Sequence, residues 1–243
     1  MFTKAKPDPP DRPRRFYKTA EAAPEGGGFT VKLDARTLKT PQGRPLLLPT
    51  MAAADLVAGE WAAQGEQIVV ADMPASRLAF TAVDRVAEAR EEVAAEVARY
   101  ANSDLLCYFA EAPEALIRRQ QDQWAPLLDW ARAELGVELT PCVGVVHQAQ
   151  PPETIAAVEA LALRLDNYAL TALAHAAALL GSAVLALALE RGRIGGEEAF
   201  DLSRLDEAYQ EEQWGVDAEA AARTARLRAE ADTLERWFRS LRA

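Results

Sequence analysis

The sequence predicts an α+β protein, in which a small N-terminal antiparallel-sheet domain with a covering helix is followed by a larger all-helical C-terminal domain. Apolar and polar residues alternate near the N-terminus, as in strands, and apolar residues take helical spacing from about position 50 onward. Hydrophobic residues make up 50% of the 243 residues and charged residues 26%, the balance of a globular protein. We expect the two domains to be residues 1–85 and 86–243.

Short strands are predicted between residues 14 and 49. The clearest alternation of apolar with polar residues is at Phe29, Val31 and Leu33, and a turn residue, Asp34, follows. The glycines at 26–28 precede this strand and open no helix, so they favour a hairpin loop over a phosphate-binding loop.

The covering helix is predicted to begin at Thr50, as its N-cap, and to run to about Gln64. Val57 and Trp61 lie one turn apart on its expected buried face. Residues 68–75 then have the pattern of an extended segment.

Helices are expected for most of the remaining chain. Ser76 is the predicted cap of a helix that reaches Tyr100. Pro113 suits the first turn of another helix, which Pro126 should bend or split. Three or four further helices should follow, with breaks near Asn167, at 192–196 and at Gly215.

Two of these helical segments are expected to pack against other parts of the chain. Residues 167–189 carry no charge and are long enough to span a bilayer, but their many alanines favour a buried core helix. The last helix is predicted from Asp217, and its apolar stripe should pack on its own domain. The stripe consists of Leu227, Ala231, Leu234, Phe238 and Leu241.

Charge and composition narrow the choice of partner and compartment. The formal net charge of −10 makes nucleic acid and anionic membrane surfaces poor partners and a basic protein surface a good one. The N-terminus has no apolar run for a secretory signal, and Asp8 and Asp11 disfavour a mitochondrial transit peptide. We therefore expect a cytoplasmic protein that is monomeric when free and does not insert stably into a membrane.

The sequence offers no convincing catalytic, metal or cofactor site. His147 and His175 have no acid or cysteine at metal-ligand spacing, and the two cysteines, Cys107 and Cys142, lack a CxxC spacing. Cys107 lies in an apolar stretch, where a free cysteine is more often a core residue than a nucleophile. No nucleotide-binding or nucleophile motif occurs, so we expect no catalysis, no metal and no cofactor.

The segment 205–215 is the most informative candidate for binding. On a helix, one side would carry acids, amides and an indole, namely Asp206, Glu207, Gln210, Glu211, Gln213 and Trp214. Neither Glu211 nor Glu212 has a basic residue three or four positions away, so these acids would suit an Arg or Lys of a partner. The alternative is a solvated helix face with Trp214 tucked into the core. A small-molecule enzyme that uses the acidic helix and a general helical adaptor also remain open.

Short segments along the whole chain resemble those of a known protein family. Matching segments occur in the same order as in the assembly chaperones of the ATP synthase catalytic head (the F-one ATPase). Among these chaperones, the sequence is most similar to the class that binds the alpha subunit, called the ATP-twelve chaperones. The matching segments include Arg15-Phe16-Tyr17, Leu33-Asp34-Ala35-Arg36, Pro45-Leu46, Glu60-Trp61, Met73-Pro74, Trp124-Ala125-Pro126-Leu127, Gly181-Ser182, Leu205-Asp206-Glu207 and Trp214-Gly215. The likeness covers nearly the whole chain. Ala35 departs from it, because the family usually has glycine there.

The resemblance implies a chaperone that binds the unassembled alpha subunit and prevents its aggregation until beta replaces it. It implies a partner-binding role for Glu207, Gln210, Glu212 and Trp214, and a mainly structural role for Trp61. It also implies a bacterial protein with relatives in the mitochondrial matrix. From the residues, we expect Glu207 and Glu212 to meet basic groups of the partner while Trp214 holds the helix end against the domain. Glu207 and Glu212 lie five positions apart, roughly 140° around a helix, so they cannot both face one partner patch, and the alternative is that one of them anchors the helix internally.

Overall fold

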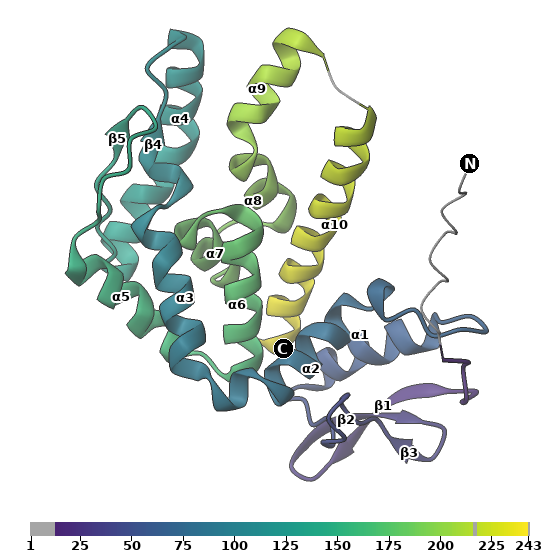
Figure 1. The fold of residues 1–243 in the computed structure, drawn as a ribbon. Coiled ribbons are helices and arrows are strands. Elements are labelled where there is room, and N and C mark those ends of the chain that lie inside the picture. The colour runs from purple at the N-terminus through teal and green to yellow at the C-terminus, as the bar shows by residue number, and fades with distance from the viewer. Residues whose placement is uncertain (1–12, 216–217, 243) are drawn as a thin grey trace, which may run out of the picture.

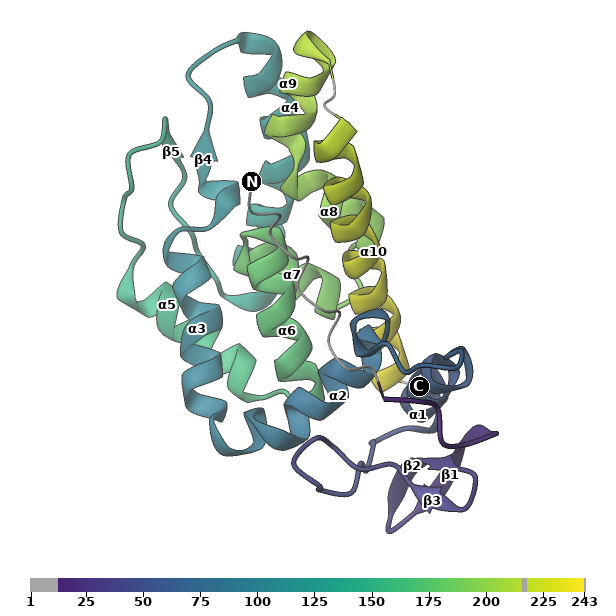
Figure 2. The same cartoon turned by 45° about the vertical axis from the view of Figure 1, so that its right-hand side comes forward.

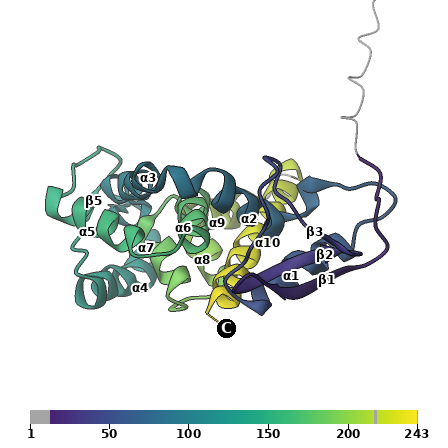
Figure 3. The ribbon, with the colours of Figure 1, turned by 90° about the horizontal axis from the view of Figure 1, so that it is seen from below.

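The computed structural model describes residues 13–215 and 218–242 and has a small sheet at one end and a layer of helices at the other (Figure 1). The three-stranded sheet lies on the outer side of α1, away from the helical part, as the view from below also shows (Figure 3). The α+β fold class predicted from the sequence is confirmed.

The sheet is antiparallel and has the strand order β1-β2-β3. Its strands are β1 (Ala20–Glu25), β2 (Gly28–Leu33) and β3 (Arg36–Thr37). Gly26 and Gly27 form the β1–β2 hairpin turn with positive φ angles of 59° and 86°, as expected of a glycine loop. In the next turn Asp34 takes the positive φ of 53°. Ala35 does not, so this turn does not need a glycine at position 35.

Helix α1 (Met51–Ala62) covers the sheet and packs against β1 and β2. Thr50 is its N-cap, and the Thr50 hydroxyl accepts a hydrogen bond from the Ala53 N–H, as predicted. Trp61 is only 7% exposed, and its ring centroid lies 5.7 Å from that of Tyr17. The Tyr17 hydroxyl donates to the Trp61 carbonyl at 2.7 Å, which ties the N-terminal segment to the end of α1.

The prediction of one helix from Ser76 to Tyr100 was wrong. The segment contains α2 (Pro74–Asp84), the 3-10 turn η2 (Val86–Glu88) and α3 (Arg90–Asn102), and a further turn, η1 (Val70–Asp72), interrupts the expected extended stretch. Ser76 is not the cap. Glu60 of α1 accepts hydrogen bonds from the Ala75 and Ser76 N–H groups, both at 2.7 Å, and so caps α2 from outside the segment.

Helix α4 (Glu114–Trp130) starts directly after Pro113 and continues through Pro126 without being split. It ends in a π-turn, η4 (Ala131–Leu135). Around it, the turn η3 (Leu105–Cys107) leads into β4 (Tyr108–Phe109), which pairs in parallel with β5 (Cys142–Val143). Cys107 is buried as predicted, and burial raises the pKa of its thiol, which disfavours the reactive thiolate.

The apolar segment 167–189 is largely buried, as predicted, but it forms two helices rather than one. After α5 (Pro152–Leu163) come α6 (Asn167–Leu180) and α7 (Ala183–Glu190). Gly181 ends α6 in the left-handed region, and the Ser182 hydroxyl caps α7 by accepting from the Leu185 N–H. Within the described residues, no helix combines the length and apolar character needed to cross a bilayer.

The chain closes with α8 (Gly196–Ser203), α9 (Leu205–Trp214) and α10 (Ala218–Leu241). The predicted start of the last helix, Asp217, lies outside the described residues. Ala231, Leu234 and Phe238 of its predicted stripe are buried. The stripe packs on the same chain, because α10 contacts α6 and α8 as well as α1 and α2.

The two ends of the molecule share one continuous core of buried hydrophobic residues. Helix α1 packs against α10 and α2 packs against α6, so the elements on either side of residue 85 are closely joined. The division into residues 1–85 and 86–243 stays a prediction.

Candidate functional site

Helix α9 carries the predicted binding residues and lies beside α4 at the end of the helical layer farthest from the sheet (Figures 1 and 2). Leu205 is its only buried residue. The helix ends at Gly215, which has a φ of 87° that favours glycine. Most of α9 therefore presents side chains to solvent or to polar groups of α4.

An ion pair joins the second half of α9 to α4. Arg119 donates two hydrogen bonds to the Glu212 carboxylate, at 2.8 and 2.9 Å, in a bidentate arrangement. The same guanidinium lies 5.3 Å from the ring centroid of Tyr209. The hydrogen bond from Arg119 lowers the pKa of Glu212, so this carboxylate stays ionised well below neutral pH.

A buried amide joins the first half of α9 to α4. The Gln120 Nε2 donates to Asp206 at 2.7 Å, and its Oε1 accepts from the Ala110 N–H at 2.8 Å. Gln120 is fully buried. Burial raises the pKa of Asp206, and the Gln120 hydrogen bond opposes this effect.

The four predicted binding residues all lie on α9, but in different environments. Glu207 pairs with Arg204 at 2.7 Å within one helical turn, and Gln210 is exposed. Glu212 pairs with Arg119 of the same chain. The expectation that Glu212 is free to pair with an Arg or Lys of a partner was therefore wrong. Trp214 is 80% exposed, so it neither holds the helix end against the domain nor fills the core.

Arg119 and Arg204 were not predicted from the sequence as partners of these acids. Arg204 lies three positions before Glu207, so helical spacing alone could have revealed that pair. Arg119 lies 93 positions before Glu212, and no local pattern joins them.

A cleft of about 330 Å³ lies beside α9, between α4, α8, α9 and α10. Glu207 and Glu211 contribute to its lining, whereas Glu212 does not. Arg228 of α10 donates to Asp201 at 2.6 Å, and Glu207 is paired with Arg204. Much of the charge around the cleft is thus paired within the chain, which is a poor setting for general acid and base catalysis.

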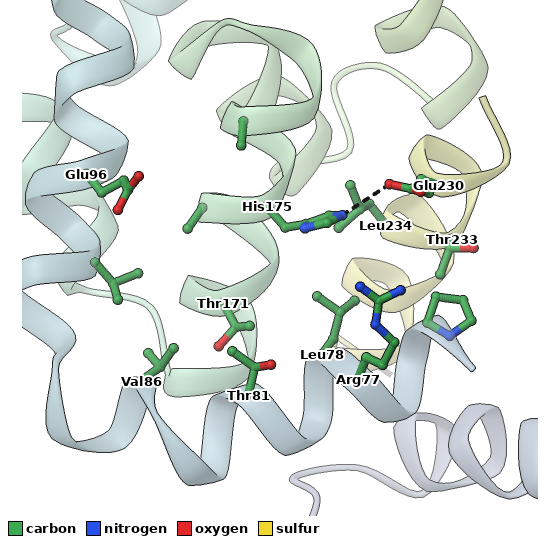
Figure 4. Close-up of a pocket in the computed structure, with 14 residues that line it drawn as sticks. Arg77, Leu78, Thr81, Val86, Glu96, Thr171, His175, Glu230, Thr233 and Leu234 are labelled. Carbon is green, nitrogen blue, oxygen red and sulfur yellow. Dashed lines mark ion pairs between the residues drawn. The ribbon is translucent and has the colours of Figure 1, made fainter. Parts of the chain in front are cut away.

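A second cleft, of about 340 Å³, lies between α2, α3, α6 and α10 (Figure 4). Its lining is mostly apolar, with His175 and Glu230 facing each other at 3.5 Å. No cysteine or serine lines the cleft. Within residues 13–215 and 218–242, His, Cys, Asp and Glu form no cluster of three or more that could hold a metal ion.

Comparison with known proteins decides the family. Residues 14–132 match the family model for the ATP12 chaperone protein. Atp12 from Paracoccus denitrificans, whose crystal structure is known, is 42% identical and superposes with a TM-score of 0.88, over 94% of this chain and 98% of that chain. The chain belongs to the ATP12 chaperone family.

Two further relatives agree with this assignment. A protein of Agrobacterium tumefaciens with a known crystal structure is 44% identical to this chain and superposes with a TM-score of 0.87. The match covers 94% of this chain and 86% of that one. Mitochondrial atp12 of Schizosaccharomyces pombe is 26% identical over 214 residues, which are 83% of this chain and 74% of that protein. The family resemblance seen in the sequence is confirmed, and with it the class of chaperones for F1 ATP synthase assembly.

Proposed function

We propose that this ATP12-family chaperone binds the unassembled alpha subunit of the ATP synthase head, its client, in the cytoplasm of a bacterium. Glu207, Gln210, Glu212 and Trp214 of α9 belong to the proposed client-binding face. The observation that carries this proposal is the 80% exposure of Trp214 at the end of an acidic helix. Exposed indoles are typical of binding hot spots, and the acids suit basic groups of a client.

The physical need for such a chaperone follows from the subunit it holds. An alpha subunit made before its partners exposes an apolar interface, and surfaces of this kind drive aggregation. A chaperone that covers the interface keeps the subunit available. Release needs no ATP if beta forms the larger and better-packed contact and so displaces the chaperone.

Replacing Trp214 with alanine or Glu207 with lysine should weaken client binding without unfolding the protein. Each variant should need at least about tenfold more chaperone to suppress aggregation of alpha, since loss of a hot spot or charge reversal in a contact has effects of this size. Melting temperatures should barely change, because Trp214 is exposed and Glu207 belongs to an exposed ion pair.

Glu92→Lys on α3 is the matched charge-reversal control, because Glu92 is exposed and lies on a different helix. It should protect alpha as well as the wild type does. If both α9 variants also protect alpha fully, the client binds elsewhere on the chaperone.

We expect the protein to bind no ATP. The sequence has no phosphate-binding loop, and the net charge of −10 repels a polyphosphate. Titration calorimetry with ATP should show no saturable binding at micromolar concentrations. Saturable binding would instead favour the rival interpretation of α9 as part of a small-molecule enzyme.

A general helical adaptor would bind several partners. Mass spectrometry of proteins that co-purify with the tagged chain from its host separates the two ideas. A dedicated chaperone should retain the alpha subunit above all other proteins, whereas an adaptor would retain several unrelated ones.

A further inference from the structure

Helix α9 is too short and too exposed to be stable by itself. It has 10 residues, of which only Leu205 is buried. Isolated helices of this length are marginal in water, and most helices in proteins are stabilised by packing an apolar face. Contacts from outside must therefore hold α9 in place.

Among the described residues, Arg119 of α4 makes side-chain hydrogen bonds to the second half of α9. Its guanidinium bonds both oxygens of Glu212, at 2.8 and 2.9 Å, and lies over the ring of Tyr209 three positions earlier. A planar guanidinium that bonds a carboxylate through two parallel N–H groups fixes direction as well as distance. An isolated exposed ion pair contributes little, but bidentate geometry within a network is the recognised exception.

The position of Trp214 depends on the same contact. Trp214 is two residues beyond Glu212 and is 80% exposed, so no packing of its own ring determines where it lies. Its placement therefore follows the last turn of α9, in which Glu212 is bonded by Arg119.

We propose that Arg119 is a positioning residue for the client-binding face, and that Glu212 acts through its ion pair with Arg119 rather than by bonding a basic group of the client. The inference rests on the proposed function of α9 and deepens it. It divides that face into residues offered to the client, foremost Trp214, and an internal pair that presents them.

A charge swap tests the proposal. Arg119→Glu places two acids opposite each other, Glu212→Arg places two bases there, and the double variant Arg119→Glu/Glu212→Arg restores an ion pair of reversed direction. Each single variant should need about tenfold more chaperone to suppress aggregation of alpha. The double variant should recover to within about threefold of the wild type, because the contact of Arg119 with Tyr209 is not regained.

Hydrogen exchange gives a second readout. Each single variant should speed exchange of the backbone amides at 208–214 and leave those of α6 unchanged, and the double variant should restore protection. General destabilisation of the fold would instead speed exchange in both helices and would overturn the proposal.

Arg118→Glu is the matched control, because Arg118 is the neighbouring base on α4 and pairs only within its own helix, with Glu114 at 3.6 Å, among the described residues. It should protect alpha as the wild type does. A loss equal to that of Arg119→Glu would show an effect of overall charge and overturn the proposal.

Three outcomes have distinct meanings. If the double variant is as defective as Glu212→Arg, Glu212 meets the client directly and the positioning role is wrong. If Arg119→Glu protects fully, Arg119 has no such role. If the wild type itself fails to protect alpha, it is the proposed function that fails, and α9 ordering by Arg119 can still be read from hydrogen exchange.

Discussion

Trp61→Arg is expected to lower the free energy of unfolding by about 4 kcal/mol or more, a large fraction of the roughly 5–15 kcal/mol by which folded proteins are stable. Trp61 is 7% exposed and packs against Tyr17 at the end of α1. An arginine would lose most of that apolar contact and would bring a charge to a buried position. Urea unfolding followed by circular dichroism measures the change.

Trp61→Phe is the control for Trp61→Arg. It keeps an aromatic body at the site, and it removes an indole N–H that has no hydrogen-bond partner among the described residues. We expect it to cost much less than the arginine variant. If Trp61→Arg keeps the wild-type unfolding midpoint and loses only binding to alpha, then Trp61 is a binding residue and its structural role is wrong.

Gly196→Ala is expected to be the most damaging change of a single methyl group, with a loss of about 3 kcal/mol. Gly196 begins α8 against the backbone of α10. An added Cβ would lie 2.5 Å from the Ala231 carbonyl oxygen and 2.9 Å from the Asp232 Cα. A flexible side chain could relieve such a clash by changing its rotamer, but backbone atoms cannot, so α8 and α10 would have to move apart.

Gly59→Ala is the matched control for Gly196→Ala. Gly59 lies within α1, and a Cβ there would meet no atom within 4 Å. Because alanine favours a helix over glycine, this variant should gain about 0.5–1 kcal/mol. Thermal melting of the two variants should therefore shift in opposite directions. Equal melting temperatures would show that α8 and α10 are not packed as closely as the structure has them.

The sequence alone was sufficient where a structure depends on neighbouring residues. The alternation at Phe29, Val31 and Leu33 predicted a strand, and the Thr50 side chain predicted the start of α1, because both signals act within a few positions. The spacing of Val57 and Trp61 likewise predicted which face of α1 is buried.

The sequence was insufficient where the deciding partner is distant along the chain. Ser76 has the right chemistry for an N-cap, yet Glu60 of another helix takes the N–H groups at the start of α2. A single helix from 167 to 189 was expected because this segment is long and carries no charge, whereas Gly181 and Ser182 divide it into two packed helices.

The candidate site shows the same division. Its acids, amides and indole could be placed on one helix from spacing alone, and the family resemblance rested on segments that the sequence displays directly. That Glu212 is paired with Arg119 and that Trp214 stands in solvent could not be read from the chain. The Glu212–Arg119 pair depends on how α4 packs against α9, because the two residues are 93 positions apart in the sequence and only tertiary packing brings them together.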